Sequence, residues 1–338
     1  MIRAATIVAR IHMWGNRLGW GISAAIAIVV IGTLSFYVRG ATKTSQPTQL
    51  GLDAVAQGSL ALGVSPQSVL SGEPASCDAA QLYSEAIALY RRDPNGYDGI
   101  AGGSRAGSDA LAKFPAIQRL IEAKNCSQMT LFTNDPALVI RYGDAPDLDA
   151  LLKVGKAAVR AGLAYKSANR NFEAIKCYEA AFALGAKFYD ERLTYRQLMA
   201  GLELMGESGV GLSSLNFARG DTTRSEAAQK FDVARRKLFS SSVQPISGAL
   251  ISIDARTVSR HAGDVFYIAE NARERMWRVE AILSLGRMRF FVGEGGRIGD
   301  QRGAERALKR YAQDTDPVIR AAAKAALELT REQMRMLG

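Results

Sequence analysis

The sequence has few of the residues that metal-dependent and triad-type enzymes use. Its 338 residues include only two histidines, His12 and His261, and three cysteines. Zinc sites are built mainly from histidine and cysteine, and a Ser-His-Asp triad needs a histidine beside its nucleophile. We therefore expect no metal, no cofactor and no catalysis of the triad type. No histidine is near Cys177 in the sequence, so we interpret this cysteine as a small core residue.

Segments in which apolar and polar residues alternate, as they do in half-buried strands, are also scarce. Instead, Ala, Leu, Glu, Arg and Lys dominate long segments in which apolar residues recur at three- and four-residue spacing. Hydrophobic residues make up 48% of the chain, which is enough for a sizeable core. The sequence therefore predicts an all-α protein.

Acidic residues are absent from the first 50 positions, which contain five basic ones. A second basic excess lies at residues 256–338, with 16 basic and 11 acidic residues. A solvated helix face explains this second excess, and binding of anionic lipid, glycan or nucleic acid is the alternative. Nucleic acid and metal ions are not among the partners that we expect.

One long hydrophobic run lies near the N-terminus, from Trp20 to Val38, and contains no charged residue. As a helix, it would approach the thickness of the hydrocarbon core of a bilayer. We predict a cytoplasmic tail at residues 1–18, a transmembrane signal anchor in contact with lipid at residues 19–39, and a flexible linker at residues 40–76. A cleaved leader and a buried core helix are the alternatives.

The basic residues around this run favour one orientation. Arg3, Arg10 and Arg17 precede it, whereas only Arg39 and Lys43 follow it closely. By the positive-inside rule the N-terminus is cytoplasmic. In a bacterium this topology places the protein in the inner membrane with its C-terminal domain in the periplasm.

Two cysteines flank a predicted helical hairpin. Helical periodicity covers residues 78–92 and 108–125, with a Gly-rich loop at residues 95–107 between them. In an antiparallel hairpin the start of the first helix and the end of the second helix meet. Cys77 and Cys126 occupy these positions, so a disulfide is possible there in an oxidising compartment. Two buried thiols are the alternative.

Residues 147–186 predict a second helical hairpin, with Asp147 as the N-cap of its first helix and a polar turn in the middle. This segment resembles the tetratricopeptide repeat, a helix pair of about 34 residues, and the resemblance extends more loosely over residues 147–240 and back to residue 78. The positions that carry it are Gly162, Tyr165, Ala174, Tyr178 and Ala181. In this pattern the small residues let two helix backbones approach while the tyrosine rings fill the groove between them.

The C-terminal part, residues 264–336, resembles HEAT repeats. Residues 303–330 contain a first helix, a turn that ends in Asp316-Pro317, and a second helix with Arg320 at the family's Arg position. Arg278 precedes Arg320 by 42 residues, within the usual HEAT period. The resemblance implies that Arg320 meets the aspartate of the turn before it, which here is Asp314 or Asp316.

These observations predict a tetratricopeptide-like domain at residues 77–242 and a HEAT-like domain at residues 243–338. Helical repeats bind protein or peptide partners along extended surfaces without any catalytic group. We therefore expect a membrane-anchored scaffold and not an enzyme. An envelope enzyme such as a glycan-active hydrolase is the alternative, and a deep pocket with an isolated Asp or Glu would favour it.

Overall fold

A computed structural model describes residues 57–72, 75–102, 107, 109–128, 131–244, 247, 250, 258–290 and 298–336. From Ala54 onward the chain makes one compact unit. The predicted cytoplasmic tail and membrane anchor lie outside the described residues. Among the helices that the structure does describe, none combines the length and the apolar character that a bilayer span requires.

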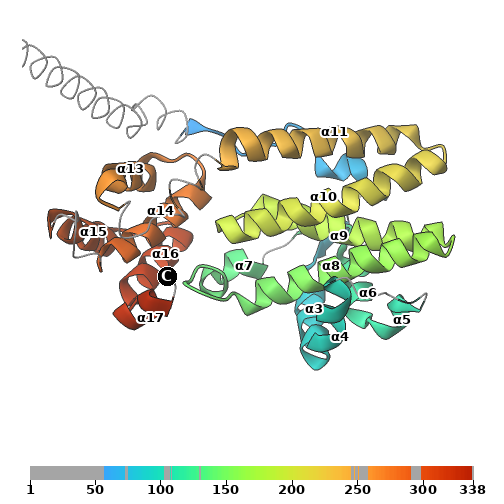
Figure 1. Cartoon of the computed structure of the whole chain (residues 1–338), viewed down its shortest axis with the longest axis horizontal. Helices are drawn as coiled ribbons and strands as arrows, with labels where there is room; N and C mark the ends of the chain where they lie inside the picture. The colour runs from blue at the N-terminus through green and yellow to red at the C-terminus, as the bar shows by residue number, and fades with distance from the viewer. Residues whose placement is uncertain are drawn as a thin grey trace, which may run out of the picture. The chain divides into compact units, whose positions relative to one another are not determined.

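The described part is helical almost throughout, which confirms the all-α prediction (Figure 1). The first elements are η1 (Pro66–Val69), β1 (Ala75–Asp78), α3 (Ala80–Arg92), α4 (Pro94–Ala101), α5 (Ala110–Lys113), α6 (Pro115–Ala123), β2 (Cys126–Gln128), α7 (Leu131–Asn134) and η2 (Pro136–Leu138). Four long helices follow, α8 (Pro146–Ser167), α9 (Asn171–Glu191), α10 (Tyr195–Ala218) and α11 (Thr222–Leu238). The chain ends with the π-helical η3 (Phe239–Val243), α13 (Val258–Asn271), α14 (Arg275–Met288), α15 (Ile298–Tyr311), α16 (Pro317–Glu328) and α17 (Arg331–Met336).

Side-chain caps explain where several helices begin. Thr194 accepts a hydrogen bond from the Gln197 amide at the start of α10, and Asp221 accepts one from the Arg224 amide at the start of α11. Such caps satisfy amide groups that have no partner inside the helix. The cap predicted at Asp147 is wrong by two residues, because α8 already begins at Pro146 and Ala145 is its N-cap. Asp147 lies in the first turn of α8, where its charge complements the helix dipole.

Helices α8, α9, α10 and α11 pack side by side in chain order, and we call them the central stack (Figure 1). Glycines allow the closest approach between them. A Cβ atom on Gly201 of α10 would lie 2.7 Å from the carbonyl oxygen of Gly185 on α9, so only glycine fits there. The Tyr178 ring packs between α8 and α10, where Cβ atoms on Gly162 and Gly211 would lie 3.1 and 2.6 Å from it.

The flexible linker predicted for residues 40–76 needs correction in its second half. Residues 59–72, which we call the strap, pack onto the helices, and Leu60 and Val69 are buried. The Leu60 amide donates to Glu274 at the start of α14 at 2.9 Å, and the Tyr189 hydroxyl of α9 donates to the Leu60 carbonyl. A few well-spaced apolar residues therefore order a segment whose composition is typical of a linker.

The hairpin predicted at residues 78–125 also differs in detail. The expected Gly-rich loop begins with helix α4, because Pro94 fits the first turn and Asp93 accepts from the Gly96 amide at 3.0 Å. The second helical run is split into α5 and α6, since Phe114 precedes Pro115 and leaves the helical conformation. A small parallel β1–β2 pair, which the sequence analysis missed, joins the segment before α3 to the segment after α6.

The C-terminal helices pack closely as well. A Cβ atom on Gly286 of α14 would lie 2.9 Å from that of Ala326 on α16. Arg320 meets Asp314 of the turn, as its family position implied, but through the backbone: its Nη1 donates to the carbonyl oxygens of Asp314 and Thr315, at 2.7 and 2.8 Å. The sequence favours a loop at His261, but the structure places this residue in helix α13.

Hydrogen bonds join these helices to the central stack. The Tyr195 amide at the start of α10 donates to Glu280 of α14 at 2.8 Å. Burial raises the pKa of Glu280, and the hydrogen bond from Tyr195 opposes this effect. Arg192, which follows α9, pairs with Glu274 at 3.2 Å. The two predicted domains, 77–242 and 243–338, thus share polar contacts within one unit.

Candidate functional site

The exposed apolar side chains are concentrated in one region of the molecule. Within the described ranges, all large hydrophobic side chains that remain exposed belong to the central stack. They are Leu163, Phe172, Val210, Phe217 and Val233, with exposed fractions of 49%, 63%, 61%, 69% and 67%. Single exposed apolar residues are normal on a protein surface, but their concentration on adjacent helices makes this region the candidate site.

Two of these residues lie at the same level on neighbouring helices. Lys156 of α8 pairs with Glu203 of α10 at 2.6 Å, and Lys166 donates to Ser214 at 2.7 Å. These contacts fix the register of α8 against α10. Since Leu163 and Val210 each lie between the two cross-links, they lie at the same level of the two helices.

A groove of about 680 Å³ lies between α10 and α11, and we call it the α10–α11 groove. Its floor contains the small residues Gly209, Ser213, Ser225 and Ala228. The Ser225 hydroxyl donates to the Ser213 carbonyl at 3.0 Å, and the two hydroxyls lie 3.2 Å apart, so the serines bind each other across the floor. The exposed Val210, Phe217 and Val233 also line the groove, which is therefore shallow, apolar and open.

Basic residues predominate beside this groove. Helix α11 contains five basic residues and two acidic ones, Glu226 and Asp232. Both acids already have partners on the same helix, because Glu226 pairs with Lys230 at 3.9 Å and Asp232 pairs with Arg235 and Arg236. Partial burial would raise the pKa of Asp232, but the hydrogen bonds from the two arginines outweigh it and lower this pKa. Helix α11 as a whole therefore has a net positive charge, whereas the charged residue that lines the groove itself is Asp232.

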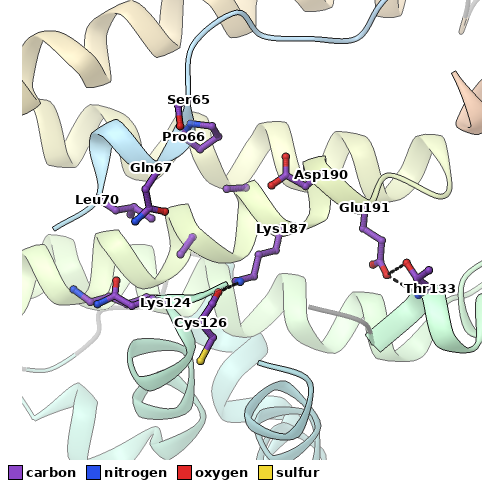
Figure 2. Close-up of a pocket in the computed structure, with 13 residues that line it drawn as sticks. Ser65, Pro66, Gln67, Leu70, Lys124, Cys126, Thr133, Lys187, Asp190 and Glu191 are labelled. Atoms are coloured by element: carbon purple, nitrogen blue, oxygen red, sulfur yellow. Dashed lines mark hydrogen bonds between the residues drawn. The ribbon is translucent and has the colours of Figure 1, made fainter. Parts of the chain in front are cut away.

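A second, polar pocket of about 380 Å³ lies between the strap, the β2 region and α9 (Figure 2). Lys187 of α9 points across it and donates to the Cys126 carbonyl, and burial lowers the pKa of its amine. Glu191 accepts from the Thr133 amide and hydroxyl, both at 2.6 Å. Its other oxygen accepts from the Gln197 amide group at 2.6 Å.

Asp190 and Glu191 line this pocket, and burial raises the pKa of Asp190, a feature that the enzyme alternative predicts, but the two carboxylates do not form the pair that glycan cleavage needs. Asp190 and Glu191 are consecutive on α9, so their side chains leave the helix about 100° apart instead of facing each other. Glu191 is also held by Thr133 and Gln197. In the part of the chain that the structure describes, no three His, Cys, Asp or Glu side chains are grouped as metal ligands would be.

A buried carboxylate beside the pocket holds the strap in place. Glu179 of α9 is 2% exposed and accepts from the Ser71 amide and hydroxyl, both at 2.8 Å. Lys124 forms an ion pair with the same carboxylate. The partners of Glu179 are Ser71 and Lys124 of the same chain. We therefore interpret Glu179 as a residue that holds the strap against α9.

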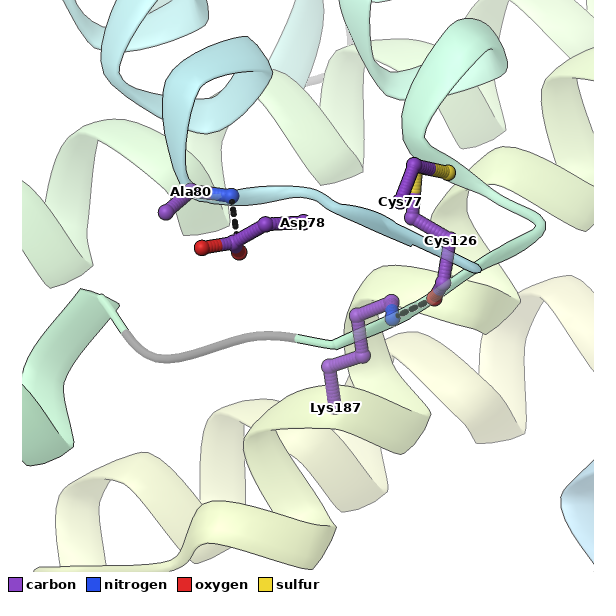
Figure 3. Close-up of a disulfide and its surroundings, with 5 residues drawn as sticks. All are labelled: Cys77, Asp78, Ala80, Cys126 and Lys187. Carbon is purple, nitrogen blue, oxygen red and sulfur yellow. Dashed lines mark hydrogen bonds between the residues drawn. A yellow bond between two sulfur atoms is a disulfide. The ribbon is translucent and has the colours of Figure 1, made fainter. Parts of the chain in front are cut away.

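The structure joins Cys77 and Cys126 in a disulfide, with their Cα atoms 4.7 Å apart (Figure 3). The sequence argument paired these residues at the ends of two helices, whereas the parallel β1–β2 pair brings them together. Lys187 donates to the carbonyl of the same Cys126, so the disulfide and the polar pocket share one residue. Cys177 is buried, and burial raises the pKa of its thiol to about 12.

The residues that carried the repeat resemblance are part of the scaffold and do not line the groove. Gly162, Tyr165, Ala174, Tyr178 and Ala181 are all buried between helices. The Tyr165 hydroxyl accepts from the Leu111 amide at 2.9 Å, and the Arg170 guanidinium lies 4.7 Å from the centre of its ring. The sequence analysis missed Val210 and Phe217, although their seven-residue spacing places both on one side of α10.

The chain matches no protein-family model, no curated protein and no solved structure.

Proposed function

We propose that this protein is a helical-repeat scaffold that binds another protein through the exposed apolar surface of the central stack, without catalysis. The concentration of the exposed large apolar residues on α8–α11, together with the open α10–α11 groove, is the observation that supports this function. Interaction surfaces are expected where contiguous apolar side chains remain in contact with water.

We infer that α8–α11 are tetratricopeptide-like and that α13–α16 are HEAT-like. The packing of Tyr178 between Gly162 and Gly211, and of Gly286 against Ala326, supports helix pairs that stack in this way. Repeat arrays present long surfaces to extended or helical partners, and terminal units that face water have a polar outer face. The α10–α11 groove is apolar instead, which supports a partner on this face.

We further propose that residues 19–39 anchor the scaffold in a bacterial inner membrane, with the helical domain in the periplasm. The hydrophobic run and the basic residues before it support the anchor and its orientation. The Cys77–Cys126 disulfide supports an oxidising compartment for the domain.

The proposed function can be tested by photo-crosslinking of the full-length protein in its native membrane. A photoreactive residue at Val210, in the groove, is compared with one at the exposed Ser84 on α3. We expect a single protein adduct from position 210 and none from position 84. The proposal fails if both positions give the same adducts or if neither gives any.

A further inference from the structure

The α10–α11 groove resembles the open end of a helix stack. No described segment covers it, since Val210, Phe217 and Val233 remain 61%, 69% and 67% exposed. The other side of the same helix pair is occupied, because α9 packs against α10 and η1 packs against α11. The groove is therefore the position at which a further helix would continue the packing.

The shape of the groove fits a helix. The small residues of the floor recur at helical spacing on both helices, with Gly209 and Ser213 on α10 and with Ser225 and Ala228 on α11. Such stripes create the hollow between two helices into which the side-chain ridge of a third helix packs. Phe217 and Val233 stand beside this hollow and can cover the apolar side of an inserted helix.

The charge of α11 selects among possible occupants. Lys230 and Arg236 are exposed at 72% and 71%, and the neighbouring Lys237 is exposed as well. Lys230 and Arg236 are themselves the partners of Glu226 and Asp232, but α11 has five basic residues against two acidic ones, so this helix keeps a net positive charge and attracts negative charge. A second copy of the chain, docked through the same groove, would bring two basic α11 helices together and would be disfavoured.

We propose that the α10–α11 groove binds an amphipathic α-helix of a partner protein, with its apolar stripe in the groove and acidic residues on its flanks. The inference rests on the proposed function and adds the class of the partner segment. Amphipathic helices bind grooves through apolar residues at i, i+3, i+4 and i+7, which matches an open groove between two helices.

The experiment uses the full-length protein in phosphatidylcholine nanodiscs and two labelled peptides of about 18 residues, long enough for five helical turns. Both peptides have the same leucine stripe, which is flanked by Glu in one peptide and by Lys in the other. By fluorescence anisotropy we expect the Glu peptide to bind about tenfold more tightly than the Lys peptide.

Two sets of variants locate the binding. The single variant Val233→Asp should weaken the Glu peptide about tenfold, whereas Ser84→Asp should leave its affinity unchanged. The double variant Lys230→Glu with Arg236→Glu should reverse the preference between the two peptides. Circular dichroism checks that each variant keeps its helical content.

Equal affinity for both peptides, no binding, or binding that is insensitive to Val233→Asp would overturn the inference. Sedimentation that reveals a dimer dissociated by Val233→Asp would assign the groove to a second copy instead. Binding to phosphatidylglycerol vesicles that is lost in the same variant would assign it to a lipid surface.

If position 210 gives a protein adduct that the Glu peptide does not reduce, the helix inference fails while the scaffold proposal stands. Without adducts and without peptide binding, both fail.

Discussion

Two surfaces of the central stack differ in what covers them. The strap covers part of α9, where Glu179 and Tyr189 bind its backbone and side chains. Nothing among the described residues covers the α10–α11 groove, although its rim is apolar. The covered surface uses its polar groups within the chain, whereas the open surface leaves apolar groups in water. Exposed apolar area, and not buried charge, therefore identifies the proposed binding surface.

The largest expected effect concerns the disulfide beside the covered surface. Replacing Cys77 and Cys126 with serine should lower the free energy of unfolding by about 4 kcal/mol, because the bond closes a long loop in the unfolded chain. Urea unfolding of the full-length protein in detergent micelles measures this loss. A reducing agent should destabilise the wild type to the same extent and leave the variant unchanged. Identical midpoints for wild type and variant would refute the prediction.

The next effect tests the attachment of the strap. Glu179→Ala removes a buried carboxylate, leaves Lys124 without its ion pair and frees Ser71, so we expect a loss of about 3 kcal/mol. The same unfolding assay measures it, and proteolysis within residues 59–72 should accelerate. Glu226→Ala, which removes an exposed pair beside the open groove, is the matched control and should cost less than about 0.5 kcal/mol. A similar loss in both variants would show that the strap is not held as we describe.

Two glycines of α10 should respond in opposite ways. Gly201→Ala places a methyl group against backbone atoms of α9 and should destabilise the protein by about 2 kcal/mol. Gly209→Ala meets only the Phe182 ring, at 3.6 Å, and should stabilise the helix by up to about 1 kcal/mol. Since Gly209 forms the floor of the groove, the same variant should weaken the Glu peptide. Unfolding and anisotropy measure the two effects, and a loss of stability in Gly209→Ala would contradict the geometry.

The smallest change in stability is expected at the rim of the open groove. Val210→Asp and Phe217→Asp alter side chains that are mostly in water, so the free energy of unfolding should change by less than about 0.5 kcal/mol. Peptide binding should nevertheless decrease strongly. A large loss of stability would mean that the rim is part of the core and not a binding surface.

The sequence predicted much of the scaffold. Helical periodicity located α8 and α9 closely, and the spacing of Gly162 and Tyr178 anticipated their packing because both residues act locally within a helix pair. The pair Cys77 and Cys126 was found for a partly wrong reason, since two short strands and not helix ends bring the cysteines together.

The candidate site was harder to predict, because it depends on which surfaces remain open. Leu60 and Val69 occur in a segment with the composition of a linker, and tertiary contacts with Tyr189, Glu274 and Glu179 order it. A valine such as Val210 fits a helix equally well in the core and on the surface, so the residue type does not predict its exposure. Its exposure follows from the end of the stack at α11, which no local pattern specifies.

Hydrogen exchange on the full-length protein tests the central claim most directly. With saturating Glu peptide, amide exchange should slow in residues 209–217 and 225–233 and stay unchanged in α3 and α16. Uniform protection over all helices, or protection confined to the polar pocket around Lys187, would contradict the assignment of the groove as the binding surface.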